Sequence, residues 1–499
     1  MTTALAPADA GTFRPTDEQQ SAVDAFRTGE NVTIIAGAGS GKTSTLRFLA
    51  DEAPGKRGLY LAFNKSVQLD AQRRFSGTGV QPRTINSLAY SAFGDQSRQR
   101  MNMKRLMPFE KKRALGMETK FPMGTSFVSW QKVLRLTYQT LEAFCRSFRD
   151  EIELDMVELP PTILGPKHDR EALRVSILKY ANLWWADWLN PNGVIEHTHS
   201  TYMKRWALSK PQLPYDYLLV DEAQDLEPLT RGLLAMQDTQ VITVGDPNQA
   251  IYGWRGAQNA LNDFGGIRTY LTQSFRFGDA IAEEANFWLA LLESDMRIQG
   301  LPGKKSSVWA SKRRPEAVLT RTNGGAMEEI IESQRHGLAV AVAGERKKGE
   351  LVDLANAALE LQSTGKTKHR ELDDFTSWDD VVAFVSEDGA DSEIAALVKV
   401  VDSYGATAVV KAMESTVPTD DADQTVSTVH VAKGLEWFHV RIADDFREPG
   451  IDKNTGEQKP LAAEEGRLCY VAVTRAERHL DASGLDWAKT MTGGVSEEA

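Results

Sequence analysis

The chain has 499 residues, of which 41% are hydrophobic and 25% charged, and its formal net charge is −11. This length exceeds what one hydrophobic core usually serves, so we expect a globular protein with at least two domains. The acidic balance argues against a protein that coats DNA through overall positive charge, but it does not exclude a local nucleic-acid groove.

The cysteines and the first residues of the chain indicate the cellular compartment in which the protein is expected. Cys145 and Cys469, the two cysteines, are far apart and lack metal-ligand spacing, which favours a reducing compartment over a disulfide framework. Residues 1–13 have neither the basic nor the apolar region of a signal peptide, and no run of about 18 apolar residues predicts a membrane span. We expect a cytoplasmic protein without membrane contact.

Short apolar runs alternate with helical stretches along the chain, which predicts parallel α/β sheets. The expected strands form two groups, and therefore two lobes: residues 31–36, 58–63, 217–220 and 241–244, and then 317–320, 338–342, 426–429 and 440–442. Residues 98–212 and the acidic residues 345–420 predict mainly helical insertions. We expect Trp184, Trp185 and Trp188 to pack the core of the first insertion rather than to contact nucleic acid.

A glycine-rich turn follows the first expected strand and precedes the helical stretch 44–50. Its small residues let backbone N–H groups wrap phosphates at a helix N-terminus. Lys42 would reach the β- and γ-phosphates of ATP, and the Thr43 hydroxyl would reach Mg²⁺. Ala36 replaces the first glycine of the strict pattern, and the alternative is a turn without a ligand. The expected nucleotide contacts are Gly37, Ala38, Gly39, Ser40, Gly41, Lys42 and Thr43.

Two carboxylates follow the apolar strand at residues 217–220. They lie at the carboxyl end of a buried strand, where open α/β sheets bind ligands. Asp221 can supply the hard anionic oxygen that Mg²⁺ needs, and Glu222 can orient or deprotonate the attacking water. An acidic strand end alone is usually a solvated loop, but the phosphate loop upstream favours the catalytic interpretation.

Three further side chains have two interpretations each. Arg276 and Arg475 can stabilise charge that develops on the γ-phosphate, although either one alone is more often a structural salt-bridge partner. Gln19 can recognise adenine through its amide, and it equally fits a helix capping box that begins at Thr16. The sequence pattern does not separate the two interpretations of Gln19.

The loop at residues 244–257 contains a polar residue suited to contact a phosphate and an aromatic residue suited to contact a nucleobase. Gln249 suits a phosphate sensor, and Trp254 suits stacking on a nucleobase, because every base has a π-face. A tryptophan between glycine and arginine in a polar loop has no obvious role in a core. Downstream of a phosphate loop and an acidic metal site, this loop predicts a motor driven by ATP along a nucleic-acid strand.

The ordered set of blocks resembles the UvrD/Rep/PcrA-like superfamily 1A DNA helicases. The matching blocks lie at residues 19–23, 36–43, 62–65, 84–89, 221–225, 244–257, 274–276, 428–437 and 464–476. One block alone is a modest signal, whereas all of them in this order are specific. Asn64 directly after Phe63, Asn86 in place of a histidine, and residues 273–275 in place of an Asn-Tyr pattern resemble the F-box helicase and phage-type branch.

The resemblance implies an α/β fold with two RecA-like P-loop NTPase lobes, mainly helical insertions, and ATP with Mg²⁺ in the cleft between the lobes. Lobe 1 would comprise residues 1–97 and 213–268, with a helical insertion at 98–212. Lobe 2 would comprise residues 269–344 and 421–499, with a reduced acidic helical insertion at 345–420.

The resemblance also implies roles for individual residues. Gln249 matches the γ-phosphate sensor, Arg276 and Arg475 match finger arginines, and Phe275 and Glu436 match residues near adenine and ribose. Gln19 would contact adenine. A place in the core is the alternative for Phe63, which ends an apolar strand. The residues expected to contact a nucleic-acid strand are Phe63, Asn64, Thr84, Tyr252, Trp254, Arg255 and His430.

We therefore expect an ATP-dependent helicase and translocase that moves 3′ to 5′ on single-stranded DNA and acts at junctions with duplex DNA. Direction and DNA preference come from the resemblance alone. One alternative is a translocase that displaces proteins from DNA but barely unwinds it. The other is an ATP-gated clamp on single-stranded DNA, against which Glu222, Arg276 and Arg475 argue. The sequence identifies no protein partner.

Overall fold

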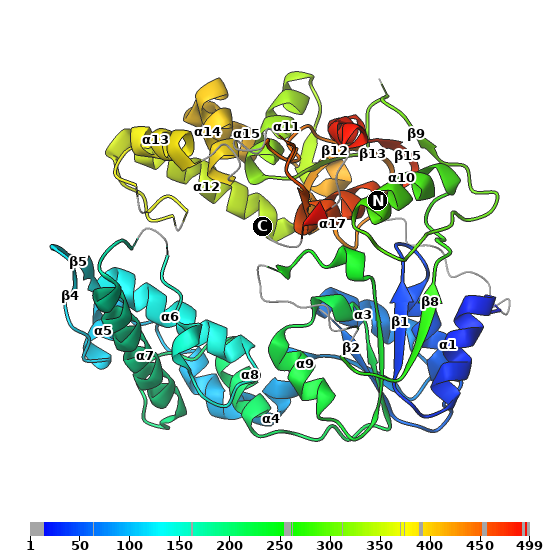
Figure 1. Cartoon of the computed structure of the whole chain (residues 1–499), viewed down its shortest axis with the longest axis horizontal. Coiled ribbons are helices and arrows are strands. Elements are labelled where there is room, and N and C mark those ends of the chain that lie inside the picture. The colour runs from blue at the N-terminus through cyan, green and yellow to red at the C-terminus, as the bar shows by residue number, and fades with distance from the viewer. Residues whose placement is uncertain are drawn as a thin grey trace.

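Two six-stranded sheets form the centre of the molecule (Figure 1). The computed structural model describes residues 14–62, 64–160, 163–253, 261, 263–311, 313–369, 371–373, 375–388, 393–451, 457–491 and 495–496. Each sheet belongs to one lobe, and the two lobes lie one above the other on the right of Figure 1. The predicted α/β class, with two lobes and mainly helical insertions, is confirmed.

The first sheet has the strand order β3-β2-β6-β7-β1-β8, and all neighbouring strands are parallel. Its strands are β1 (Val32–Ala36), β2 (Gly58–Ala62), β3 (Val80–Thr84), β6 (Tyr217–Val220), β7 (Gln240–Gly245) and β8 (Ile267–Leu271). The helices of this lobe include α1 (Asp17–Arg27), α2 (Lys42–Asp51), α3 (Lys65–Arg74) and α9 (Pro228–Ala235). Because the strands are parallel, the carboxyl ends of β1, β7 and β6 meet at one edge.

The second sheet has the order β11-β12-β10-β13-β15-β9 and is also parallel. Its strands are β9 (Ser307–Val308), β10 (Ala317–Thr320), β11 (Val340–Val342), β12 (Gln424–Thr428), β13 (Trp437–Ile442) and β15 (Ala476–Asp481). The accompanying helices are α10 (Asp279–Leu291), α11 (Asn323–Arg335), α16 (Val429–Ala432) and α17 (Ala463–Val473). A short pair, β14 (Leu461–Ala462) and β16 (Val495–Ser496), lies outside this sheet.

Four strands of the two sheets were not predicted, namely β3, β8, β9 and β15. The sequence of β15, Ala-Glu-Arg-His-Leu-Asp, is mostly polar, and the strand forms because β13 and β9 supply hydrogen-bonding neighbours on both sides. β8 pairs with β1 along its whole length, so the first sheet extends to Leu271, past the expected division between residues 268 and 269.

The first insertion is an arm with its own hydrophobic core. It begins within α4 (Ile85–Met101) and contains α5 (Pro108–Ala114), the hairpin β4 (Lys120–Met123) and β5 (Ser126–Ser129), α6 (Trp130–Arg146), α7 (Lys167–Leu189) and α8 (His199–Leu208). Trp184, Trp185 and Trp188 of α7 are buried in that core, as predicted. Each aromatic side chain buries a large apolar area, which lets the arm fold around few residues.

The second insertion packs directly on the second sheet. It consists of α12 (Glu345–Thr364), α13 (Trp378–Asp388), α14 (Glu393–Tyr404) and α15 (Ala406–Glu414). One hydrophobic cluster joins these helices to Val318, Val340 and Val426 of the sheet. On the left of Figure 1 the two insertions face each other, and Arg135 Nη1 lies 2.9 Å from Asp373 Oδ2. Such a partly exposed ion pair contributes about 0–1 kcal/mol.

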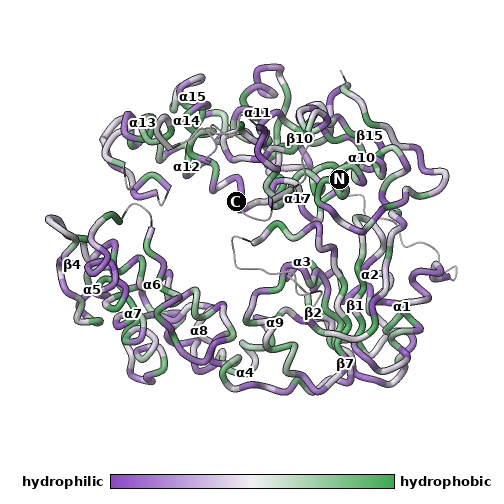
Figure 2. Tube along the Cα trace, in the orientation of Figure 1, coloured by the Kyte–Doolittle hydropathy of each residue, from purple (hydrophilic) through white to green (hydrophobic). Residues whose placement is uncertain are grey.

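The two lobes share one hydrophobic cluster. It includes Ile35 and Leu61 of the first sheet together with Ile281 of α10 and Leu468 and Val471 of α17. Figure 2 shows hydrophobic residues along β1, β2 and β7, where the first sheet lies between its helices. Apolar burial of this kind stabilises roughly in proportion to its area. The lobes are therefore held together by packing as well as by the polar contacts described below.

Candidate nucleotide site between the lobes

The loop after β1 has the backbone shape of a phosphate cradle. Gly39 and Gly41 have φ values of 72° and 78°, in the left-handed region that glycine adopts without a steric penalty. A Cβ at Gly39 would lie 2.6 Å from both Arg276 Cβ and Ser274 Oγ. The Phe275 N–H donates to the Gly39 carbonyl at 2.8 Å. The loop is thus fixed against the segment that follows β8 and leads into lobe 2.

The first two residues of α2 face the acidic end of β6. Lys42 Nζ lies 3.4 Å from Glu222 Oε1, and Thr43 Oγ1 lies 3.4 Å from Asp221 Oδ2. Tyr60 of β2 donates its hydroxyl hydrogen to the same Asp221 oxygen at 2.6 Å. The amine, the hydroxyl and the two carboxylates that the sequence suggested as one site are therefore together at the carboxyl edge of the first sheet.

The charges in this pocket perturb one another. Burial lowers the pKa of Lys42, but the carboxylates of Glu222, Asp246 and Asp221 together outweigh burial and raise it. Burial opposes ionisation of Glu222 as well, yet Lys42 and Lys433 bring the pKa of Glu222 down to about 2. Burial and the neighbouring Glu222 raise the pKa of Asp221. At neutral pH Lys42 is therefore charged and Glu222 is ionised.

Glu222 has a strained backbone. Its φ of 51° places a non-glycine residue in the left-handed region, which costs on the order of 1–2 kcal/mol. Gln224 holds the side chain by donating from Nε2 to Glu222 Oε2 at 2.6 Å, while its own Oε1 accepts from the Asp246 N–H at 3.1 Å. Strain of this kind persists only where the surroundings fix it, and it concentrates at functional sites.

Two arginines approach the pocket where the lobes meet. Arg276 Nε donates to Glu436 Oε2 at 2.7 Å, and its Nη1 donates to the Thr474 carbonyl at 2.9 Å. Arg475 is 2% exposed and donates to the Val471 carbonyl and the Thr474 hydroxyl. In the described part of the chain no carboxylate pairs with Arg475. Burial and the nearby Arg276 lower the pKa of Arg475 to about 9.

The Phe275 ring and the Gln19 amide flank the same glycine. A Cβ at Gly41 would lie 3.3 Å from Phe275 Cε2 and 3.3 Å from Gln19 Nε2. The two interpretations of Gln19, a helix cap and a contact with adenine, both depend on where this amide lies. The capping box is present, because Gln19 Oε1 accepts from the Thr16 N–H at 3.0 Å. Gln19 Nε2 donates to Thr45 Oγ1 at 3.2 Å. The cap therefore fixes the amide beside the phosphate loop.

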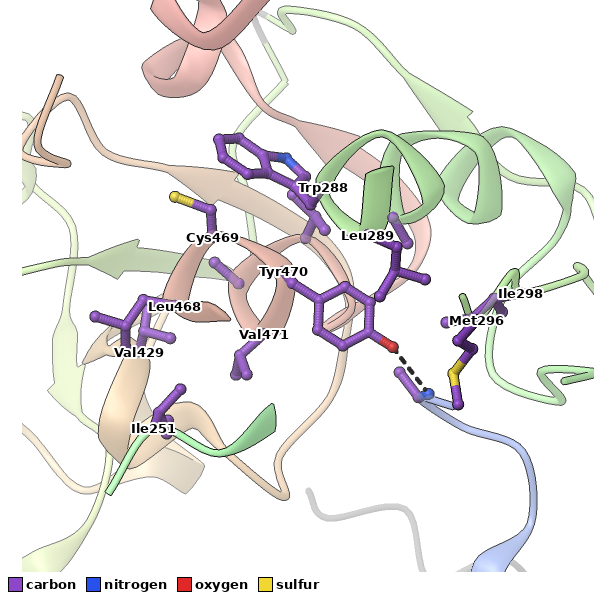
Figure 3. Packing of buried hydrophobic residues seen from close by; sticks show 14 of the residues in the cluster. Ile251, Trp288, Leu289, Met296, Ile298, Val429, Leu468, Cys469, Tyr470 and Val471 are labelled. Carbon is purple, nitrogen blue, oxygen red and sulfur yellow. Dashed lines mark hydrogen bonds between the residues drawn. The ribbon is translucent and has the colours of Figure 1, made fainter. Parts of the chain in front are cut away.

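A tyrosine from lobe 2 reaches into the phosphate loop. Figure 3 shows Tyr470 of α17 packed near Leu289 and Met296, and its hydroxyl accepts the Ala38 N–H at 3.3 Å. The same hydroxyl donates to Asp246 Oδ2 at 2.9 Å. Burial and Asp246 raise the pKa of Tyr470 well above its ordinary value, so the phenol keeps its proton. One hydroxyl thus joins the two lobes at the nucleotide loop.

Gln249 lies on the same network. Its Nε2 donates to Asp246 Oδ2 at 2.8 Å, and its carbonyl accepts from Lys433 Nζ at 2.6 Å. Gln249 is buried at the end of a 3₁₀ turn, Pro247–Gln249, that follows β7. Since β7 lies between β1 and β6 in the sheet, this turn sits beside both the phosphate loop and the acidic pair.

Four of the residues predicted to contact a DNA strand are described by the structure, and they lie in two pairs: Tyr252 with His430, and Thr84 with Asn64. Tyr252 donates its hydroxyl hydrogen to the His430 carbonyl at 3.1 Å, and the two rings are 6.2 Å apart. Thr84 and Asn64 each cap a helix, with side-chain oxygens accepting backbone N–H groups at 3.2 Å and 2.9 Å. Both caps lie at the carboxyl ends of neighbouring strands, β3 and β2. The predicted DNA contacts Phe63, Trp254 and Arg255 lie outside the described residues.

Sequence reasoning missed Tyr60, Asp246, Lys433 and Tyr470 as members of this network. Tyr60 lies inside a buried strand, and nothing distinguishes its pattern from that of a core tyrosine. The other three lie inside blocks that the resemblance had already matched. These contacts join residues more than 160 positions apart, and such pairings follow only from the tertiary fold.

The described ranges contain no group of three or more His, Cys, Asp and Glu side chains placed to hold a metal ion. They also contain no helix with the length and apolar character needed to cross a bilayer.

Removing the Tyr470 hydroxyl should destabilise the junction of the lobes. In Tyr470→Phe the Ala38 N–H loses its acceptor and Asp246 loses a donor, so we expect the free energy of unfolding to fall by about 1–3 kcal/mol. Urea denaturation followed by circular dichroism measures it. Tyr270→Phe, at a half-exposed tyrosine of β8, is the matched control. Equal stability of the two variants would contradict the bridging role.

Two family models match the chain. The UvrD/REP helicase N-terminal domain matches residues 177–263, and the UvrD-like helicase C-terminal domain matches residues 317–484. The chain is 29% identical, over 93% of its length, to F-box DNA helicase protein 1 of Schizosaccharomyces pombe and to F-box DNA helicase 1 of Gallus gallus. It covers 57% and 48% of those proteins.

DNA helicase II of Escherichia coli (strain K12) is 27% identical over 58% of the chain, which covers 41% of that protein. The chain thus spans about half the length of the curated relatives it matches. These similarities confirm the resemblance inferred from the motif order. With two family models that together match about half of its residues, the chain belongs to the UvrD-like helicase family.

Proposed function

We propose that this protein is an ATP-dependent DNA helicase that translocates 3′ to 5′ along single-stranded DNA. One observation carries the proposal: residues of both lobes converge on one pocket. Lys42 and Glu222 come from lobe 1, Arg475 comes from lobe 2, and Arg276 lies on the segment between them. A pocket shared by two bodies can convert a change in its occupant into a relative movement of those bodies.

The pocket fits a nucleoside triphosphate with Mg²⁺. The loop at residues 37–43, with the Lys42 amine, would hold the phosphates, and Phe275 with Gln19 would flank adenine, with Glu436 near the ribose. Thr43 Oγ1 and Asp221 Oδ2 are adjacent oxygens suited to Mg²⁺, which commonly binds through one or two protein oxygens together with phosphates and water. Bound there, the metal would neutralise charge on the phosphates.

Two kinds of side chain would then act on the γ-phosphate. Glu222, ionised and held by Gln224, orients the attacking water and accepts its proton. Arg475 and Arg276 stabilise the charge that develops in transfer. A buried guanidinium without a carboxylate partner is costly, and an anionic ligand offsets that cost. The burial of Arg475 therefore supports a phosphate as its partner. Gln249 senses the γ-phosphate from the turn after β7.

The proposed division of the chain is the one inferred from the sequence, with β8 included in the first lobe. Lobe 1 and lobe 2 bind and hydrolyse ATP between them, and the insertions at residues 98–212 and 345–420 flank the DNA. The strand contacts are Phe63, Asn64, Thr84, Tyr252, Trp254, Arg255 and His430. The names of the relatives, F-box DNA helicase and DNA helicase II, support DNA as the substrate. The proposed direction rests on the family resemblance.

Tailed duplexes test the function directly. We expect single-stranded DNA to stimulate ATP hydrolysis, and duplexes with a 3′ single-stranded tail to be unwound faster than duplexes with a 5′ tail. A parallel assay follows displacement of streptavidin from biotinylated DNA. Displacement without unwinding would favour a protein-displacing translocase. Absence of stimulation by DNA would favour a clamp with negligible turnover, and preference for the 5′ tail would contradict the direction.

Arg475→Ala tests the shared pocket. If Arg475 stabilises the transferring phosphate, kcat for ATP should fall by on the order of 10³ or more, equivalent to about 4 kcal/mol. Arg346→Ala, at a highly exposed arginine of the second insertion, is the matched control. Binding of a fluorescent ATP analogue and circular dichroism show whether the variant still folds. A folded variant with near-normal turnover would make Arg475 a structural residue.

A further inference from the structure

Lys433 is a buried cation of lobe 2 that contacts two loops of lobe 1. It follows α16, and its Nζ lies 2.5 Å from Asp225 Oδ2 and 2.6 Å from the Gln249 carbonyl. The Lys433 and Asp225 side chains are 9% and 3% exposed. Asp225 Oδ1 accepts no hydrogen bond from a described residue, and Lys433 is the cation paired with Oδ2. Such a pair has a fixed geometry, because separating it leaves two charges buried and uncompensated.

Each of the two loops leads by short steps to the nucleotide pocket. The Asp225 N–H donates to the Glu222 carbonyl at 2.9 Å, so the two residues share one 3₁₀ turn. On the other side, the Gln249 amide bonds Asp246 Oδ2, the atom to which Tyr470 also donates. A displacement of Lys433 therefore acts on the turn that begins at Glu222 and on the turn that carries Gln249.

The third contact of Lys433 is with Tyr252, one of the residues proposed to contact the DNA strand. Its Nζ lies 5.1 Å from the centroid of the Tyr252 ring, within the range of a cation–π interaction. Tyr252 also donates its hydroxyl hydrogen to the His430 carbonyl, three residues before Lys433. Lobe 2 thus contacts Tyr252 of lobe 1 at its ring and at its hydroxyl. A DNA base that stacked on the Tyr252 ring would disturb Lys433, and through it the Lys433 contacts with Asp225 and Gln249 beside the nucleotide pocket.

We infer that Lys433 is a positioning residue that couples strand binding at the Tyr252 loop to turnover in the nucleotide pocket. It acts by holding Asp225 and Gln249 in the geometry that the pocket uses. All three of its contacts cross from lobe 2 to lobe 1, so a relative movement of the lobes changes them together. The inference rests on the proposed function and adds to it the element through which the two sites communicate.

The test compares four variants of the full chain for ATP turnover with and without oligothymidine. Lys433→Met removes the charge at similar length, Lys433→Arg keeps it, and Asp225→Asn removes the partner charge at constant shape. Lys399→Met, at an exposed lysine of the second insertion, is the control. The measured quantities are the KM for ATP and the stimulation factor, which is the ratio of kcat with oligothymidine to kcat without it. Circular dichroism confirms folding.

We expect the stimulation factor to fall at least about tenfold in Lys433→Met and in Asp225→Asn, with the KM for ATP within about threefold of wild type. Lys433→Arg should regain part of the factor, because the cation remains, and the control should match wild type. If wild type is stimulated and a folded Lys433→Met is stimulated equally, the inference fails while the proposed function stands. If Lys433→Met does not fold, Asp225→Asn decides by the same criterion. If DNA does not stimulate wild type, both fail.

Discussion

Buried charge between the lobes is the constraint on which the rest of the structure depends. Lys42 is compensated within lobe 1, by carboxylates at the ends of two strands of the same sheet. Arg475 forms no ion pair with a carboxylate among the described residues, and burial together with Arg276 lowers its pKa to about 9. Lys433 forms its ion pair with Asp225, which belongs to lobe 1. Cations of lobe 2 therefore need lobe 1, or an anion bound between the lobes, to be stable where they lie.

The packing of the lobes places these charges. α17 supplies apolar residues to the shared cluster and also carries Tyr470, with Arg475 two residues beyond its end. Packing density in such cores leaves little freedom, so a helix that moves must move as a unit. A shift of α17 relative to the phosphate loop changes the Tyr470 bridge and the position of Arg475 together. The shared core thus makes the polar contacts respond collectively rather than singly.

The sequence predicted what local pattern and motif order determine. The strands at 217–220 and 317–320 were predicted with the bounds observed, because apolar runs between polar turns have few alternatives. Strand β15 was not predicted, since its polar residues form a strand only between two neighbours. Gln19 shows the limit at the site. Its pattern fits a cap and an adenine contact, and the structure shows that the cap holds the amide beside Gly41.

We expect the affinities for nucleotide and for DNA to be linked, and one thermodynamic measurement tests this link most directly. The dissociation constant for oligothymidine is measured with and without a nonhydrolysable ATP analogue, and that for the analogue with and without oligothymidine. We expect each ligand to change the affinity of the other by the same factor, in the range of about 5- to 150-fold that coupled sites typically show. A factor of one, with both ligands bound, would contradict a pocket that works through both lobes.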